Sequence, residues 1–235
     1  MAVAASVVAA PREVGSMDKR PNWLKPYLKS DDLKQIEAAV AQAELTTSGV
    51  VVPMVVRKSC TVGHVPLLLL ALFSLLFFAI DLDHYQMVWI PLPHWLLIIL
   101  DVCILFLLVR VLAPLPFIER LLTPKGDQQE QVEQRALTEF YNIRVHHTKK
   151  STGILIFVSL MERRAVVLGD EAIAQKLAPE TWDKLLQELV GSIQSRELAN
   201  GFSKAVIDCG KLLSEHFPKP QDDTNQLQNH LVIKE

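Results

Sequence analysis

Two adjacent carboxylates, Asp170 and Glu171, are the side chains whose type and position best suit a metal ion. They follow a run of β-branched residues and precede a short helical pattern, so a strand should meet a helix there. Carboxylate oxygens are the ligands that Ca²⁺ and Mg²⁺ prefer. Acidic residues also stabilise the first turn of a helix, and we favour this structural interpretation. The pair is therefore a candidate divalent-cation site and, alternatively, a helix start.

Other candidate groups form no catalytic motif that the sequence identifies. Glu162 and Arg163 lie between two predicted strands, which indicates a solvated turn. His146 and His147 are adjacent, so their side chains project about 100° apart on a helix and cannot chelate one metal together. The chain has no P-loop, GxSxG or HExxH pattern, and the nearest match to an Asp-x-Asp nucleophile, residues 81–83, lies in a predicted loop.

Residues 61–118 contain two apolar segments around a short polar loop. The first, residues 65–80, has no charge, and the second, residues 95–112, carries Asp101 and ends near Arg110. A helix that spans a bilayer needs about 20 apolar residues. A buried hairpin in a protein core is the alternative, but core helices keep a polar stripe and these segments do not. The pattern predicts an inserted transmembrane helical hairpin.

The charges around this hairpin predict its orientation. The loop at residues 81–94 is acidic and has no Lys or Arg, and basic residues collect on the cytoplasmic side of membranes. The flanking basic residues are Arg57, Lys58, Arg110, Arg120 and Lys125. We therefore expect a two-span membrane protein, in contact with the lipid bilayer, with both termini in the cytoplasm.

Asp101 is the unusual residue of the second apolar segment. A carboxylate within a membrane span costs about 2.5–3.5 kcal/mol on insertion scales, so it should face protein or water. Ser74 in the first segment is the expected hydrogen-bond partner, in an intramembrane contact. The alternative is a hydrated position near the interface, because Trp95 is only two turns away.

Composition excludes some classes of function. The 235 residues carry a net charge of −2, which gives no argument for binding nucleic acid. The three cysteines, Cys60, Cys103 and Cys209, are far apart and lack the spacing of a zinc site.

The segments outside the hairpin predict one α/β domain. A helix from residue 30 precedes the β-branched run VVVPMVV at residues 50–56, which reads as a strand whose Pro53 suggests an edge or a bulge. An amphipathic helix follows the hairpin, and residues 154–160 and 163–170 should pair as antiparallel strands. Helices then run to Pro218, and residues 230–233 suggest a short docking strand. The first strand should join the sheet that follows the hairpin.

Several segments, taken in order, resemble the TPM-domain family in its membrane-inserted bacterial form. They are AELTTSGVVVPMVVRKS at residues 43–59, FYNIRVHHT at 140–148, TGILIFVSLMERRAVVLGDEAI at 152–173, FSKAVIDCGKLLSEHFP at 202–218 and DDTNQLQNHLVI at 222–233. The resemblance implies a three-layer α/β/α sandwich with a central mixed sheet, in a protein of a bacterial inner membrane. The expected organisation is a disordered lead-in at 1–29, the two parts of the domain at 30–60 and 126–218, the hairpin at 61–118, and a tail at 219–235.

The resemblance also implies two classes of function. Some relatives are described as acid phosphatases, some bind divalent metal, and others are accessory or assembly factors. Many relatives have a carboxylate directly after the Ser-Gly pair, where this chain has Val50, which weakens the carry-over of an acidic site. We expect a cytoplasmic-facing binding or assembly module for a membrane-associated protein. The alternative is an acid phosphatase-like hydrolase that uses Ca²⁺ or Mg²⁺ at Asp170 and Glu171.

Overall fold

The computed structural model describes residues 20–60, 63–84, 93–143, 152–219 and 230–234. Most of the predicted lead-in, His146, His147 and much of the loop between the apolar segments lie outside these ranges. The elements in chain order are α1 (Ser30–Glu44), β1 (Val50–Val56), α2 (Val65–His84), α3 (His94–Leu112), α4 (Pro116–Leu122), α5 (Lys125–Asn142), β2 (Gly153–Ser159), β3 (Arg164–Gly169), α6 (Glu171–Ala174), the 3-10 helix Pro179–Trp182, α7 (Asp183–Ser195), α8 (Leu198–His216) and β4 (Val232–Lys234).

The strands form one mixed sheet in the order β3-β2-β1-β4. β1 runs parallel to β2, with Val50 opposite Gly153, and also parallel to β4. β2 and β3 form the predicted antiparallel hairpin. The prediction that the strand before the apolar segments joins the sheet after them is therefore confirmed, as is the short strand near the C-terminus.

Pro53 lies in a central strand, so the predicted edge or bulge position is wrong for the strand as a whole. The register explains why a proline is tolerated there. The backbone N–H groups of alternate residues point to opposite neighbours, and Arg57 donates its N–H to Lys234 on the β4 side. β4 begins opposite Met54, so it does not extend as far as Pro53. A backbone N–H at residue 53 would have no strand partner, and proline lacks one.

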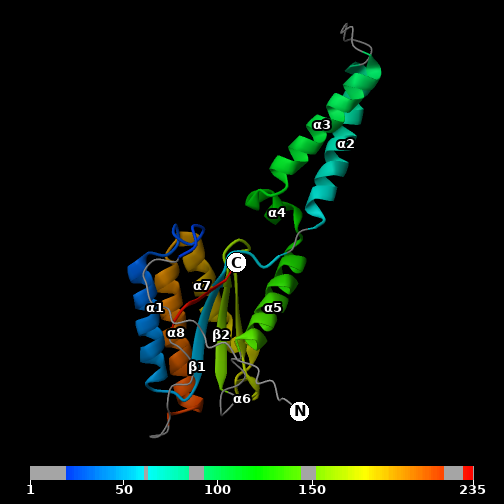
Figure 1. The fold of residues 1–235 in the computed structure, drawn as a ribbon. Coiled ribbons are helices and arrows are strands. Elements are labelled where there is room, and N and C mark those ends of the chain that lie inside the picture. Colours follow the sequence, from blue (N-terminus) through cyan, green and yellow to red (C-terminus); the bar gives the residue numbers. More distant parts are fainter. Residues whose placement is uncertain (1–19, 61–62, 85–92, 144–151, 220–229, 235) are drawn as a thin grey trace, which may run out of the picture.

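Helices cover both faces of the sheet (Figure 1). On one face α1, α7 and α8 pack against Val51, Val55 and the even-numbered residues of β2. On the other face, Val132, Ala136 and Phe140 of α5 pack against the alternate residues of β1 and β2. All residues of β1 and β2 are buried, which explains why both strands are apolar throughout.

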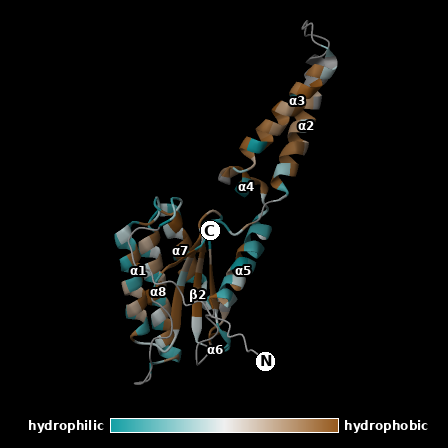
Figure 2. Cartoon of the chain, viewed as in Figure 1, coloured by the Kyte–Doolittle hydropathy of each residue, from teal (hydrophilic) through white to brown (hydrophobic). Residues whose placement is uncertain are grey.

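The two apolar segments form helices α2 and α3, which contact each other and project away from the sheet (Figures 1 and 2). Within the described part of the chain, no helix combines the length and the hydropathy that crossing a bilayer requires. The uncharged run at 65–80 would extend about 24 Å, short of a hydrocarbon core of about 30 Å. Asp101 divides the apolar run of α3. The predicted two-span topology and inner-membrane location, with cytoplasmic termini, are contradicted by this finding.

Candidate binding groove

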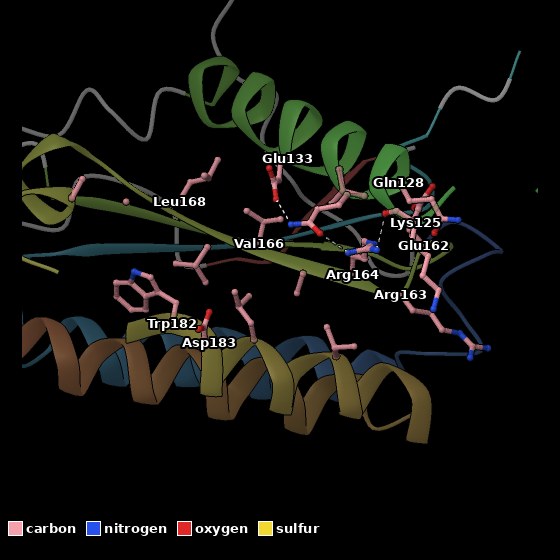
Figure 3. Close-up of a pocket in the computed structure, with 18 of the residues that line it drawn as sticks. Lys125, Gln128, Glu133, Glu162, Arg163, Arg164, Val166, Leu168, Trp182 and Asp183 are labelled. Carbon is pink, nitrogen blue, oxygen red and sulfur yellow. Dashed lines mark hydrogen bonds between the residues drawn. The ribbon is translucent and has the colours of Figure 1, made fainter. Parts of the chain in front are cut away.

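A groove follows β3, the edge strand of the sheet, between α5 and α7 (Figure 3). It has a volume of about 780 Å³ and is open to solvent. Every residue of β3 is half-buried, whereas every residue of β2 beside it is buried. We call this feature the β3 groove. Its principal lining residues besides β3 are Arg120, Lys125, Gln129, Val132, Glu133, Trp182, Asp183, Leu186 and Val190.

The floor of the β3 groove carries backbone groups that the sheet does not use. Asp170 donates its N–H to the carbonyl oxygen of Gly153 at 2.9 Å. Because the backbone groups of an antiparallel strand alternate in direction, those of Gly169, Val167 and Ala165 point away from β2. Within the described ranges, these outward groups make no hydrogen bond. The floor therefore offers donors and acceptors in the spacing of a β-ladder.

The side chains of β3 divide between the two walls. Val166 and Leu168 pack toward the core under α5, whereas Ala165 and Val167 pack toward the core under α7. Leu186 on α7 is a partly buried member of the second wall. Both walls are thus apolar close to the strand, and the groove becomes polar toward its rims.

One end of the β3 groove is basic. Arg120, Lys125, Arg163 and Arg164 line the end at which β3 begins. Figure 3 shows Lys125, Arg163 and Arg164 together there, with Trp182 and Leu168 toward the other end. None of these four cations forms an ion pair with an acidic residue that the structure describes.

The arginine that begins β3 is positioned by α5. Arg164 donates to the carbonyl oxygen of Lys125 at 2.9 Å and to Oε1 of Gln129 at 3.4 Å. Gln129 in turn donates to Glu133 at 2.9 Å. These contacts tie the start of β3 to the first turns of α5, so the basic end has a fixed shape.

A buried carboxylate anchors the turn beside the basic end. Glu162 accepts hydrogen bonds from the backbone N–H groups of Ser59, at 3.2 Å, and Cys60, at 3.0 Å, and from the hydroxyl of Ser159. The following residue, Arg163, has a left-handed backbone with φ of 52° and an exposed side chain. The expectation of a solvated turn is therefore wrong for Glu162, because the segment after β1 supplies donors for its carboxylate.

Cys60 belongs to the same anchor. Burial, and then the adjacent Glu162 carboxylate, raise the pKa of the Cys60 thiol to about 12. Its Sγ donates to the carbonyl oxygen of Gln128 at 3.8 Å. The Gln128 amide also donates to the carbonyl oxygens of Arg120, at 3.0 Å, and Thr123, at 2.8 Å. Cys60 therefore stays a neutral structural thiol, and its neighbours hold the start of α5 in place.

An ion pair joins the two ends of the α2–α3 insertion beside this anchor. Nζ of Lys58, which follows β1, lies 2.6 Å from Oε2 of Glu119 in α4. The chain thus leaves and re-enters the domain through adjacent segments, next to the basic end of the β3 groove.

Asp170 and Glu171 begin a helix, as the structural alternative predicts. Oδ1 of Asp170 accepts the backbone N–H of Glu171 at 2.8 Å, and the Glu171 side chain is exposed. Because β3 is antiparallel, the pair lies where β1 and β2 begin, away from the carboxyl ends at which such sheets usually bind ligands. The described residues include no cluster of three or more potential metal ligands. A Ca²⁺ or Mg²⁺ ion at this pair stays a prediction.

The predicted contact between Asp101 and Ser74 also stays a prediction. Asp101 is half-buried on α3, and Ser74 is exposed on α2, the helix that α3 contacts.

Sequence reasoning missed the β3 groove. One signal for it was present, because RRAVVLGD places two arginines before an apolar run with no charge in its interior. The sequence could not show that this strand lies at an edge, because that depends on the order of strands in the sheet.

Comparison with known proteins identifies the fold. No protein-family model matches the chain, and no curated protein matches its sequence. The chain is similar in structure to the BA42 protein of the psychrophilic bacterium Bizionia argentinensis, solved by NMR, with a TM-score of 0.55 and 18% sequence identity. The likeness covers 88% of this chain and 96% of BA42. At this identity the likeness supports a common α/β architecture.

Proposed function

We propose that this protein is a binding or assembly module, and that the β3 groove holds a segment of its protein partner. The observation that carries this proposal is the unused backbone ladder at the floor of the groove, between two apolar walls. Proteins usually protect such an edge, because it is a template for pairing with another chain. An unprotected edge within a groove of fixed shape suits the addition of a partner strand.

We also propose that the domain is of the TPM type, with three layers around its mixed sheet. The supports are the ordered resemblance of the segments at 43–59, 152–173 and 202–218, and the covering of both faces of the sheet by helices. Relatives that act as assembly factors agree with a binding role.

One observation favours the alternative, a divalent-metal-dependent acid phosphatase. Oδ2 of Asp170 is buried, and within the described residues it has no hydrogen-bond partner. A cation would supply one. The buried carboxylate of Glu162 is less available for chemistry, because three donors already hold it. We therefore rank binding above hydrolysis.

Site-specific photo-crosslinking tests the binding proposal. A photoreactive amino acid replaces Leu186, which lines the β3 groove, or Gln187, the next residue on α7, which is exposed and outside the groove. In cells that express the full chain, illumination should give a discrete protein adduct from position 186 and none from position 187. Equal adducts from both positions, or none from position 186, would contradict the proposal.

A phosphatase assay separates the two functions. The detergent-treated, purified chain is incubated with a chromogenic phosphate monoester, with Mg²⁺ or Ca²⁺ and with EDTA. We expect no metal-dependent turnover. Turnover that EDTA abolishes and that Asp170→Asn removes would establish the alternative instead.

A further inference from the structure

We infer that the ligand of the β3 groove is an extended peptide that pairs antiparallel with β3, is apolar on both faces, and carries carboxylates at its C-terminal end. This inference deepens the proposed binding function and depends on it. It assigns the chemical class and the direction of the partner segment.

The backbone of β3 sets the conformation of the ligand. Ala165, Val167 and Gly169 present their N–H and C=O groups to the groove at every second residue, which only an extended chain can match. The six residues of β3 extend about 20 Å at about 3.3 Å per residue. A peptide of about six residues would therefore satisfy the whole edge.

The two walls set the side chains of the ligand. Successive side chains of a strand point to opposite faces of the sheet. Those that point toward α5 would contact Val132 and Leu168, and those that point toward α7 would contact Val167, Leu186 and Val190. Because the walls are apolar near the strand, the central residues of the ligand should be apolar on both faces.

Charge, together with the commoner antiparallel pairing of strands, sets the direction of the ligand. The start of β3 has the cations Arg120, Lys125, Arg163 and Arg164. The carboxylate of Glu162 also lines this end, but it is buried and already accepts hydrogen bonds from three donors. Glu133 and Asp183 line the groove away from this end. Carboxylates are attracted to the first region and repelled by the second. In an antiparallel pairing the C-terminal end of the ligand lies beside the start of β3. Antiparallel pairs are also the more common arrangement. The ligand should therefore be acidic at its C-terminal end.

The mixed signs within the groove argue against a nucleic acid as its ligand. A polyphosphate backbone would need cations along the whole length of the groove. Here the cations are confined to one end.

Fluorescence anisotropy with a labelled peptide tests this inference on the full chain. The probe is a peptide of six alternating valines and alanines, which is apolar on both faces when extended, followed by two glutamates. The matched control has the two glutamates moved to its N-terminal end. We expect the probe to bind about fivefold to tenfold more tightly than the control, with the difference reduced at high salt.

Two variants of the chain locate the binding. Val167→Pro removes the middle outward N–H and should keep the ladder to β2, because that N–H points away from β2. It should lower the affinity for the probe at least about tenfold. Arg163→Asn replaces the arginine by a residue type that accepts a left-handed backbone. It should lower the affinity for the probe about twofold to fivefold and leave the affinity for the control peptide unchanged. Thermal melting confirms that each variant is folded.

The controls decide between outcomes. Lys184→Gln, an exposed α7 residue outside the groove, should bind the probe as the parent does. Absence of probe binding, preference for the N-terminally acidic peptide, or full binding by folded Val167→Pro would overturn the inference. If position 186 still crosslinks a protein in those cases, the proposed binding function stands and only the ligand class is wrong. If it does not, both are wrong.

Discussion

The two edges of the sheet differ in length and in protection. β4, at one edge, has three residues, and its Lys234 forms an ion pair with the buried Glu139 of α5. β3, at the other edge, has six residues with apolar side chains from Ala165 to Leu168 and unused backbone groups. Short strands and charged residues are common protections of sheet edges. The first edge follows this rule and the second does not, as the proposed addition of a partner strand at the second edge requires.

Removal of β4 should lower the free energy of unfolding more than any single substitution described below, because it abolishes the protection of the first edge. Truncation before residue 230 exposes the β1 backbone, removes the buried Leu231, and leaves Glu139 without Lys234. We expect the free energy of unfolding to fall by about 3–4 kcal/mol. Urea denaturation measures the loss, and size-exclusion chromatography should show self-association through the new edge. A truncation of Glu235 alone is the control. Undiminished stability without β4 would show that this edge needs no protection.

Glu162→Gln should loosen the turn that holds the second edge. The amide keeps one acceptor oxygen, but its NH₂ group must face backbone N–H groups that now lack a partner. We expect a loss of about 2–3 kcal/mol in the free energy of unfolding, measured by urea denaturation. The exposed Glu171→Gln should change it by less than about 0.5 kcal/mol. Equal effects of the two substitutions would mean that Glu162 does not anchor the turn.

The same anchor predicts a dependence of stability on pH. The folded pKa of Cys60 is about 12, raised from the ordinary value of 9.0, so the folded state holds this proton more tightly than the unfolded state. The protonated Cys60 thiol therefore contributes to the free energy of unfolding. This contribution is complete below about pH 9 and is lost as the pH rises toward about 12. Cys60→Ala should therefore flatten the decline in the free energy of unfolding over that window. A decline of unchanged slope in the variant would exclude Cys60 as its source. Burial also raises the pKa of Cys209, which remains in the variant and contributes to the residual slope.

The sequence predicted the sheet better than it predicted the groove. β-Branched runs and the close spacing of β2 and β3 are local signals, and they indicated the strands and their pairing across the insertion. Pro53 was misread because the length of β4 decides whether its missing N–H matters. Glu162 was misread because its donors, Ser59 and Cys60, lie about 100 residues away. The segments at 65–80 and 95–112 suggested membrane spans because most of their side chains are apolar. That interpretation gave too little weight to the charged residues that shorten the apolar runs.

Hydrogen exchange of the free protein should show a small but specific difference along β3. The amides of Val166 and Leu168 face β2, whereas those of Ala165, Val167 and Gly169 face the groove. We expect the outward amides to exchange at least about tenfold faster than the inward ones, since they have no hydrogen-bond partner within the described residues. NMR of the deuterated chain resolves the individual amides. Uniform protection along β3 would mean that its outer edge is already paired.

The most direct test of the central claim repeats this exchange measurement with the C-terminally acidic peptide at saturation. If the β3 groove accepts an added strand, the amides of Ala165, Val167 and Gly169 should become protected by at least about tenfold. The amides of β4 should keep their rates, because that edge is short and already protected. Protection that appears at β4, or unchanged exchange at all three outward amides of β3, would contradict the account.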